Sequence, residues 1–213
     1  ALGYDIFKTT NCGENWIRQL SNYPYRIESS TFISPTTGYG VSGDRVYRTY
    51  NGGDNWTIQT LPESGLNSIS FGSPSMGWIV GSNGVMFKTI NGGDNWVRQF
   101  FGFSHMNCVS FVNENTGFTV GFDGVILKTT NAGNNWLQQN SNTTQNLNDV
   151  FFVNSETGYV CGDSGVVMKT VDGGENWGIS QIGLSANLKA IFFSELNSGY
   201  CTGSNGIIIK TTN

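Results

Sequence analysis

Apolar and polar residues follow one another along the chain in short runs that return about every 40 residues. Each repeat begins with an apolar run that carries a phenylalanine, and a Gly-aromatic pair follows six residues later. The phenylalanines are Phe32, Phe71, Phe111, Phe152 and Phe193, and the pairs begin at Gly38, Gly77, Gly117, Gly158 and Gly199. A glycine-containing turn then leads to a β-branched run that ends in a basic residue and threonine, as at 84–89, 124–129, 165–170 and 206–211. Such short runs, bounded by Gly, Asn and Asp, predict β-strands.

A recurring tryptophan marks the start of a fourth run. The five tryptophans are Trp16, Trp56, Trp96, Trp136 and Trp177, and they are 40, 40, 40 and 41 residues apart. The stretch before each one, written NGGDNW in two copies, predicts a tight hairpin turn because Asn-Gly and Gly-Gly supply positive φ angles. We expect each tryptophan to lie between sheets, where burial stabilises by roughly 1.5–3 kcal/mol or more. Four short strands in about 40 residues predict an all-β fold, the β-propeller of four-stranded blades.

The five turn sequences carry a resemblance to a known motif. TTNCGENW, TYNGGDNW, TINGGDNW, TTNAGNNW and TVDGGENW resemble the Asp-box, S/T-x-D/N-x-G-x-x-W, of the sialidase-type or BNR-like repeat. The whole unit, with 116–136 as its clearest copy, is similar to the repeats of the photosystem II stability and assembly factor family. The resemblance covers essentially the entire chain and implies a propeller. It leaves the function open, because Asp-box propellers include sialidases, glycanases, sorting receptors and assembly factors.

The strand count predicts five blades in a single domain over residues 1–213. The blades are expected near 21–60, 61–100, 101–140, 141–182 and 183–213, and residues 12–20 would close the last blade as its fourth strand. Such closure covers open sheet edges. One third-strand run is then surplus, since both 4–11 and 206–213 carry this pattern. A fragment of a longer array and strand exchange between subunits stay open as alternatives.

Composition and net charge limit the kinds of partner and ligand that we expect. A net charge of −4 argues against nucleic acid, which needs clustered Lys and Arg. No apolar stretch approaches the roughly 20 residues of a membrane span. One histidine and four cysteines without CxxC spacing argue against zinc, and no cofactor or metal is expected. Low lysine content with abundant Asn, Ser, Thr and Gly favours a secreted, extracellular or periplasmic protein.

The sequence offers little for catalysis. A sialidase-like site would require an arginine cluster and a tyrosine nucleophile with its acid partner, and no such set is recognisable. Asp123, Asp149 and Asp163 look like turn residues, whereas a glycosidase needs two carboxylates facing each other. The segments between tryptophan and the next phenylalanine are nearly equal in length, so no loop is enlarged. A glycoside hydrolase is therefore the least favoured alternative.

Candidate binding residues lie in the connections, where the copies differ most. Aromatic residues without polar neighbours suggest an interaction patch in the segments 22–26 and 100–106. The candidates there are Tyr23, Tyr25, Phe100, Phe101, Phe103 and His105. A second set begins the first strand of each blade and would surround the mouth of the channel if the ring closes. This set is Glu28, Asn67, Asn107, Asn148 and Lys189.

We therefore expect a non-catalytic propeller that presents these residues to a protein or glycan partner. One alternative is a structural subunit of an extracellular assembly that exchanges its surplus terminal strand. Another, implied by resemblance alone, is an assembly factor for a membrane photosynthetic complex. The recurring basic position is expected to pack its alkyl stem and leave its head solvated. Its members are Lys8, Arg48, Lys88, Lys128, Lys169 and Lys210.

Overall fold

The structure is a computed structural model that describes residues 5–20, 26–99, 102, 105–180 and 182–212. The chain forms two compact units, residues 1–102 and 103–213, and each is described by itself. Strands dominate both units.

The described part of the first unit contains ten strands in three antiparallel sheets, whose orders are β1-β2, β3-β4-β5-β6 and β7-β8-β9-β10. The strands are β1 (Ile6–Lys8), β2 (Ile17–Leu20), β3 (Ser29–Phe32), β4 (Gly38–Ser42), β5 (Arg45–Thr49), β6 (Thr57–Thr60), β7 (Leu66–Phe71), β8 (Gly77–Gly81), β9 (Met86–Thr89) and β10 (Val97–Arg98).

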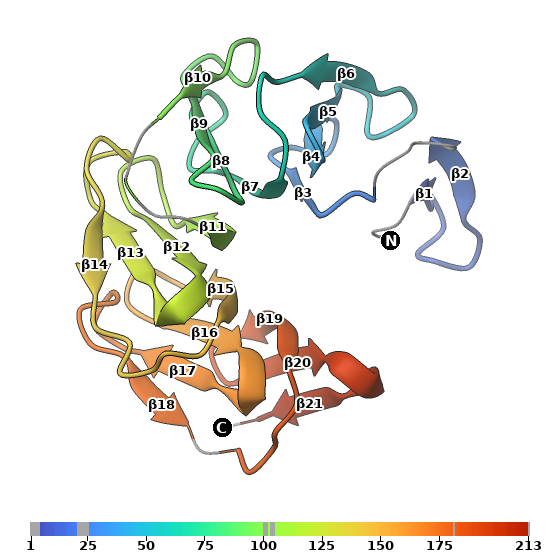
Figure 1. Ribbon diagram of the computed structural model, residues 1–213. Coiled ribbons are helices and arrows are strands. Elements are labelled where there is room, and N and C mark those ends of the chain that lie inside the picture. The colour runs from blue at the N-terminus through green and yellow to red at the C-terminus, as the bar shows by residue number, and fades with distance from the viewer. Residues whose placement is uncertain (1–4, 21–25, 100–101, 103–104, 181, 213) are drawn as a thin grey trace. The chain divides into compact units, whose positions relative to one another are not determined.

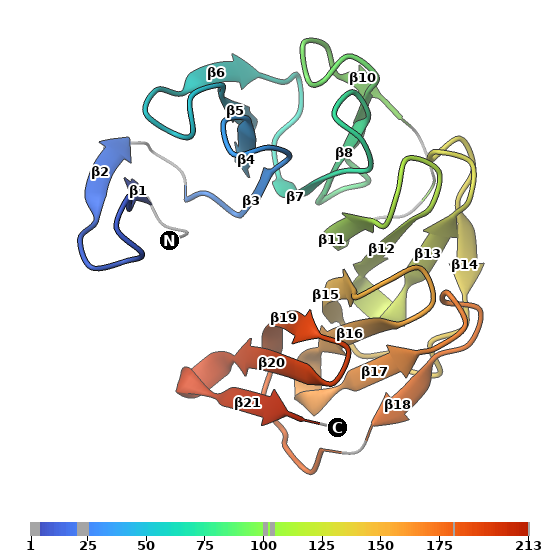
Figure 2. The same cartoon turned by 180° about the vertical axis from the view of Figure 1, so that it is seen from behind.

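The second unit continues the pattern with the sheets β11-β12-β13-β14, β15-β16-β17-β18 and β19-β20-β21. Its strands are β11 (Met106–Phe111), β12 (Gly117–Gly121), β13 (Ile126–Thr129), β14 (Leu137–Gln139), β15 (Leu147–Phe152), β16 (Gly158–Gly162), β17 (Val167–Thr170), β18 (Gly178–Ser180), β19 (Leu188–Glu195), β20 (Ser198–Gly203) and β21 (Ile208–Thr211). Three short 3-10 turns join second to third strands: η1 (Phe122–Gly124), η2 (Asp163–Gly165) and η3 (Ser204–Gly206). The three sheets of this unit lie face to face in sequence order in both views (Figures 1 and 2).

Four of the sheets have the four strands per repeat that the sequence predicts. Their second strands, β4, β8, β12 and β16, are buried along their whole length. The fourth strands, such as β14 and β18, are mostly exposed. The core therefore runs through the middle of the stacked sheets and thins toward their outer edges.

The pairing of phenylalanine with a glycine six residues later has a steric cause. A Cβ atom at Gly158 would lie 2.6 Å from the ring of Phe152, and one at Gly199 would lie 2.5 Å from the ring of Phe193. Real Cβ atoms do not approach other atoms so closely, so the ring needs a residue without a side chain beside it. Register enforces this contact, because Phe152 and Gly158 are direct partners across β15 and β16.

The Asp-box turn satisfies its own polar groups, as the sequence predicts. In the second copy, the Thr49 hydroxyl donates to the Asn51 side-chain oxygen at 3.0 Å and accepts from the Gly53 amide at 2.9 Å. The same Asn51 oxygen accepts from the Asn55 amide at 3.0 Å. Gly52 and Gly53 have φ angles of 67° and 89°, in the region that favours glycine. All five copies repeat these bonds.

Ion pairs link successive repeats, which the sequence interpretation missed. Lys128 of β13 contacts Glu175 in the Asp-box of the next repeat at 2.5 Å, and Arg48 contacts Asp94 in the same way. Lys8 and Asp54 form a third pair at 2.6 Å. The charged groups of Arg48 and Lys128 also lie over aromatic rings of their own sheets, 5.4 Å from the Tyr39 ring centroid and 5.9 Å from that of Phe118, and the expected packing of the stems stays a prediction. The expected solvated head is wrong for these three residues, because an acid from the next repeat meets it.

The tryptophans are buried to different degrees. Trp177 is 5% exposed and packs between sheets, against Phe118 of the preceding sheet and Phe152 of its own. Trp56, Trp96 and Trp136 are half-buried. Trp16 departs from the expectation and is 55% exposed. Within the described residues its sheet contains β1 and β2, and no first-strand phenylalanine of that sheet lies against the indole.

Strand pairing at the two ends bears on how the last blade is completed. β2 pairs with β1, with Lys8 opposite Ile17. Within the described residues, β21 has β20 as its only neighbour, so the last sheet has three strands. Closure of this sheet by residues 12–20 therefore stays a prediction, as do the five-blade count, the single domain over 1–213 and the blade boundaries.

Candidate functional site

The connections of the second unit meet at one end of its sheets. The turn after each second strand is tied to the segment before each first strand by a backbone hydrogen bond. Phe122 N donates to His105 O at 3.2 Å, and Asp163 N donates to Asn146 O at 2.8 Å. The contact is so close that a Cβ atom at Gly121 would lie 2.1 Å from His105 O. These connections therefore form one rim of the second unit.

Asp163 organises the polar groups of this rim. Its Oδ1 accepts hydrogen bonds from Asn148 Nδ2 at 2.8 Å and from Lys189 Nζ at 3.1 Å, and its Oδ2 accepts from Asn146 Nδ2 at 3.1 Å. Burial raises the pKa of the Asp163 carboxyl, but the bonds from Asn148, Lys189 and Asn146 outweigh it and hold the pKa below its ordinary value. The carboxylate therefore stays ionised at neutral pH.

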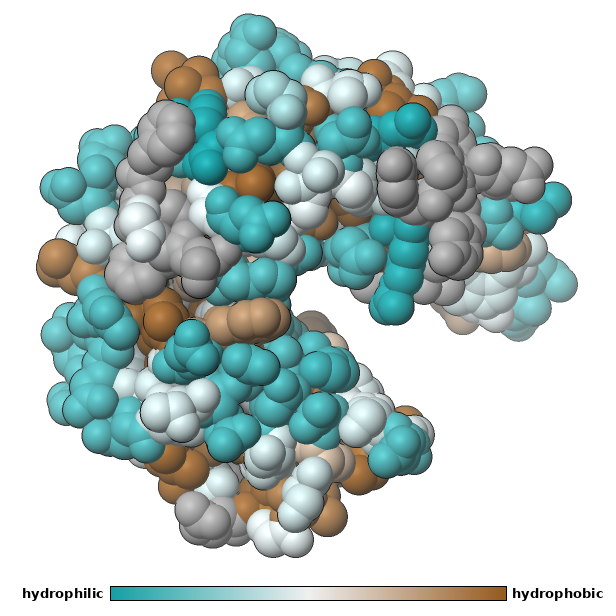
Figure 3. Space-filling model, viewed as in Figure 1, coloured by the Kyte–Doolittle hydropathy of each residue, from teal (hydrophilic) through white to brown (hydrophobic). Residues whose placement is uncertain are grey.

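An aromatic pair lies on the same rim. The rings of His105 and Phe122 stack with centroids 3.8 Å apart and an interplanar angle of 19°. Phe122 is 40% exposed. We call His105, Phe122, Asn146, Asn148, Asp163 and Lys189 the polar rim. Figure 3 shows that hydrophilic side chains cover the middle of the visible face of the second unit, around β15 and β16.

The predicted asparagines at the starts of the first strands connect neighbouring sheets. Asn107 Nδ2 donates to Leu147 O at 2.7 Å, and Asn148 Nδ2 donates to Leu188 O at 2.7 Å. Each amide thus links the first strand of one sheet to that of the next. The two asparagines approach each other, with Asn107 Nδ2 3.4 Å from Asn148 Oδ1, and Lys189 joins them through Asp163. The structure therefore brings three of the five predicted residues into one network.

Two other predicted binding residues belong to the first unit. Glu28 is an exposed residue just before β3, and Asn67 Nδ2 lies 3.5 Å from Ser82 Oγ. The remaining candidates, Tyr23, Tyr25, Phe100, Phe101 and Phe103, lie outside the described residues.

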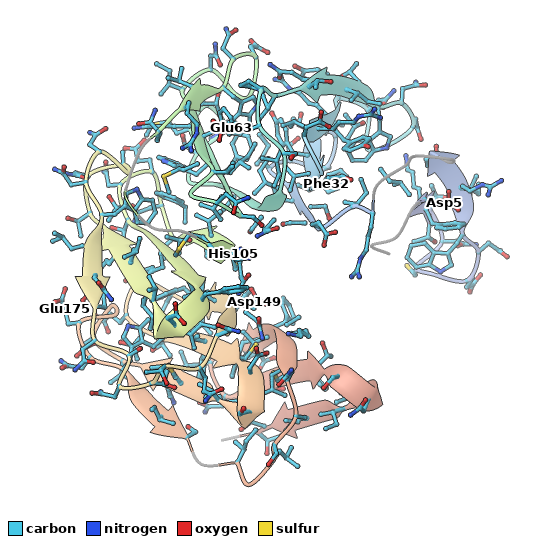
Figure 4. All side chains as sticks on the ribbon, in the orientation of Figure 1. Asp5, Phe32, Glu63, His105, Asp149 and Glu175 are labelled. Carbon is cyan, nitrogen blue, oxygen red and sulfur yellow. The ribbon has the colours of Figure 1, made fainter. Side chains whose placement is uncertain are left out.

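Asp149 differs from its expected place in a turn. It lies within β15, beside the strand that follows His105 (Figure 4). Its Oδ1 accepts from Cys108 Sγ at 3.0 Å and from Val150 N at 2.9 Å, and its Oδ2 accepts from Ile191 N at 2.9 Å. Burial raises the pKa of Asp149 above its ordinary value, although these hydrogen bonds act in the opposite direction. The carboxylate therefore links three adjacent first strands.

Asp123 and Asp163 do lie in turns, as expected, within η1 and η2. The sequence interpretation missed Phe122 and Asn146 as members of the rim. One signal was available from the internal repeat, since Phe122 begins a glycine-containing turn and Asn146 directly precedes the first strand β15. No group of three or more His, Cys, Asp or Glu side chains suited to a metal ion occurs in the described part of the chain. The cysteines there, Cys12, Cys108, Cys161 and Cys201, are free thiols.

The stacked four-stranded meanders with Asp-box turns define a BNR-repeat protein of the propeller class. A solved structure titled as the WD40 beta propeller domain of Doa1 shares the fold, with a TM-score of 0.67 at 11% identity over 90% of this chain and 66% of that one. No curated protein matches the sequence.

A family model identifies one family within this class. The model described as Photosynthesis system II assembly factor YCF48 matches residues 52–141 and 137–212, so the chain belongs to that family. The structure of YCF48 from Cyanidioschyzon merolae is similar with a TM-score of 0.78 at 20% identity, covering 97% of this chain and 76% of that one. A structure titled "YCF48 bound to D1 peptide" has a TM-score of 0.51 at 16% identity, covering 91% of this chain and 98% of the other.

The described residues include no helix that is long and apolar enough to cross a membrane.

Proposed function

We propose that this chain is a non-catalytic binding propeller that holds an extended segment of a partner protein, in the manner of an assembly factor. The observation that carries the proposal is membership of the YCF48 family, of which one similar structure holds a D1 peptide. An assembly role for a photosynthetic membrane complex follows from this resemblance. Action outside the cytoplasm stays a prediction from composition.

The polar rim is the surface that we assign to the partner segment. It combines a stacked aromatic pair with side-chain amides and an ionised carboxylate. Amide and carboxylate groups pair with the backbone of an extended peptide, and an exposed aromatic ring supplies an apolar anchor. The fixed positions of the rim groups, held by their mutual hydrogen bonds, reduce the ordering that binding would require.

Charge indicates what the partner segment should carry. Residues 103–213 contain four lysines and no arginine against eight acidic residues, whereas residues 1–102 contain seven basic and seven acidic residues. The net negative charge of the protein is thus confined to the unit with the polar rim. A neutral or basic segment is therefore favoured over an acidic one.

The test is binding of fluorescent peptides tiled across the D1 protein, followed by fluorescence anisotropy with the full chain. We expect Phe122→Ala to weaken binding at least fivefold, because it removes the exposed half of the aromatic pair. Glu114→Gln is the matched control, an exposed residue of the same unit in the turn between β11 and β12, at the other end of the strands. It should bind like the parent chain.

Two results would decide against parts of the proposal, and one control separates them from a loss of folding. Absence of binding to every peptide, together with binding on a glycan array, would favour the glycan partner instead. Peptide binding that Phe122→Ala leaves unchanged would retain the function and remove the polar rim as its site. Thermal melts of each variant, followed by circular dichroism, show whether a loss of binding reflects a loss of folding.

A further inference from the structure

Each unit has a groove where the fourth strand of one repeat meets the Asp-box turn of the next. The first-unit groove, beside β6, has a volume of about 200 Å³. The second-unit groove, beside β14, has a volume of about 490 Å³. Their walls match residue by residue at a separation of 80 or 81 positions, so they are two copies of one feature. The matched pairs include Arg48 and Lys128, Tyr50 and Thr130, and Asp94 and Glu175.

One aromatic ring accounts for the difference in volume. In the first-unit groove the ring of Tyr50 lies over Arg48, with its centroid 4.2 Å from Cζ. Its counterpart in the second-unit groove is Thr130, an exposed residue without a ring. The strand does not explain the extra space, because Leu137 of β14 is larger than its counterpart Thr57 of β6. The second-unit groove is therefore wider at the place where the first unit holds a ring.

The cations of the two grooves differ in the same way. Arg48 lies between two rings, since its Cζ is also 5.4 Å from the centroid of Tyr39. Lys128 Nζ lies 5.9 Å from the centroid of Phe118, which corresponds to Tyr39, and no described residue supplies a second ring. Both cations are paired with an acid of the next repeat, so the ion pair does not prevent stacking. An aromatic ring within about 6 Å of a cation is attracted to it.

The remaining walls suit an aromatic side chain of a polypeptide. The half-buried indole of Trp136 and the exposed side chain of Leu137 supply apolar contacts. Within the described residues β13 is the only strand beside β14, which is thus an edge of its sheet (Figure 1). An extended segment adds to such an edge through main-chain hydrogen bonds and places alternate side chains in neighbouring pockets. The groove beside β14 is such a pocket.

We infer that the second-unit groove binds an aromatic side chain of an extended partner polypeptide, which adds to the outer edge of β14. The ring takes the place that Tyr50 has in the first-unit groove. It stacks over Lys128 and contacts Trp136 and Leu137. Tyrosine is the expected residue, because a tyrosine occupies the equivalent place within this chain.

The groove is separate from the polar rim. β13 begins just after η1, which carries Phe122 of the rim, and ends just before Thr130 of the groove. The two sites thus lie at opposite ends of this strand. The inference deepens the proposed function in that the partner is again a polypeptide, but it uses no residue of the rim. Phe122→Ala should leave binding at the groove unchanged, so a failure at either site is recognised separately.

Titration of the isotope-labelled full chain with acetyl-tyrosine amide, followed by two-dimensional NMR, tests the inference. We expect shifts of the Trp136 indole and the β14 amides, and an affinity at least fivefold higher than for acetyl-leucine amide. Thr130→Tyr should weaken binding at least fivefold, because the chain then supplies its own ring. Thr130→Val is the matched control, since it has nearly the same size and no ring, and should bind like the parent chain.

Two further measurements complete the test. A capped pentapeptide with tyrosine between threonine and valine residues should bind at least fivefold more tightly than acetyl-tyrosine amide, because it adds main-chain hydrogen bonds. Thr130→Tyr should raise the melting temperature by about 1–4 °C through the new stacking contact, which also shows that the variant folds. Equal affinity for the pentapeptide and the amide would assign the groove to a free aromatic molecule and overturn the inference. Absence of binding, or binding that Thr130→Tyr leaves unchanged, would overturn it as well.

Discussion

Two sheet interfaces of the second unit, which we call the filled and the open interface, are built from equivalent residues 41 positions apart. The filled interface joins β11–β14 to β15–β18, and the open interface joins β15–β18 to β19–β21. In the filled interface Ile126, Val160 and Met168 have no exposed surface, whereas the counterparts Val167 and Ile209 are only half-buried. The sheets supply nearly the same apolar residues in both places. Within the described residues only the filled interface includes an Asp-box hairpin, whose indole, that of Trp177, covers the outer part of the core. The comparison teaches that this indole is an integral part of the core that it covers.

The largest effect should come from removing the indole of the filled interface. We expect Trp177→Ala to lower the free energy of unfolding by about 3–5 kcal/mol, because it leaves a cavity among residues that are otherwise completely buried. Urea unfolding followed by circular dichroism measures the change. Trp16→Ala, measured in dilute monomer, should cost less than about 0.5 kcal/mol because its indole is exposed. Equal losses of stability in the two variants would contradict the difference in burial between Trp177 and Trp16.

A second prediction uses pH to examine Asp149, whose counterpart in the next repeat is Ala190. The folded pKa of Asp149 is raised, so the fold favours the protonated carboxyl. The contribution is fully present below the unfolded pKa of about 3.9 and is lost as pH rises through the folded pKa, at about 1.4 kcal/mol per unit of difference.

Comparison with Asp149→Asn isolates this effect, because the amide does not titrate and the other acids titrate in both proteins. The stability of the parent chain minus that of Asp149→Asn should fall as pH rises from 3.5 toward 7. Urea titrations at several pH values give this difference. A constant or rising difference would show that Asp149 is not desolvated as the structure has it.

The smallest effect concerns the ion pair that distinguishes the interfaces. Lys128→Met removes the partner of Glu175, an exposed carboxylate, and should cost about 0.2–1 kcal/mol at low salt. The cost should shrink in 1 M NaCl because salt screens exposed charges. Lys169→Met is the matched control in the open interface, where the described residues supply no acid, and should cost nothing. A salt-independent loss in both variants would assign the effect to the alkyl stems.

The sequence predicts the local structure of each repeat well because the determining contacts are close in sequence. Phe152 and Gly158 are six residues apart, and the Asp-box bonds span at most four residues. The period of the aromatic residues then repeats this local structure along the chain. Four four-stranded sheets follow directly from these features.

The links between repeats are harder to predict, because their members lie 40 or more residues apart. Lys128 and Glu175 each recur with the repeat, but nothing in either pattern alone says that one meets the other. The polar rim is also hard to predict, although the partners of Asp163 lie only 15 to 26 residues away. Asp163 looks like an ordinary turn residue until the fold brings Asn146, Asn148 and Lys189 to its carboxylate. Asp149 misled the interpretation because a buried carboxylate is rare inside a strand.

The placement of Trp177 between its own phenylalanine and a ring of the preceding sheet has a consequence for folding cooperativity. The repeat seen in the sequence does not coincide with the unit that unfolds cooperatively, since each core contains residues of two repeats. Loss of one repeat would therefore weaken two cores, and its energetic cost would be shared by both neighbours. Duplication of a whole repeat, by contrast, creates one new core without altering the composition of those already present.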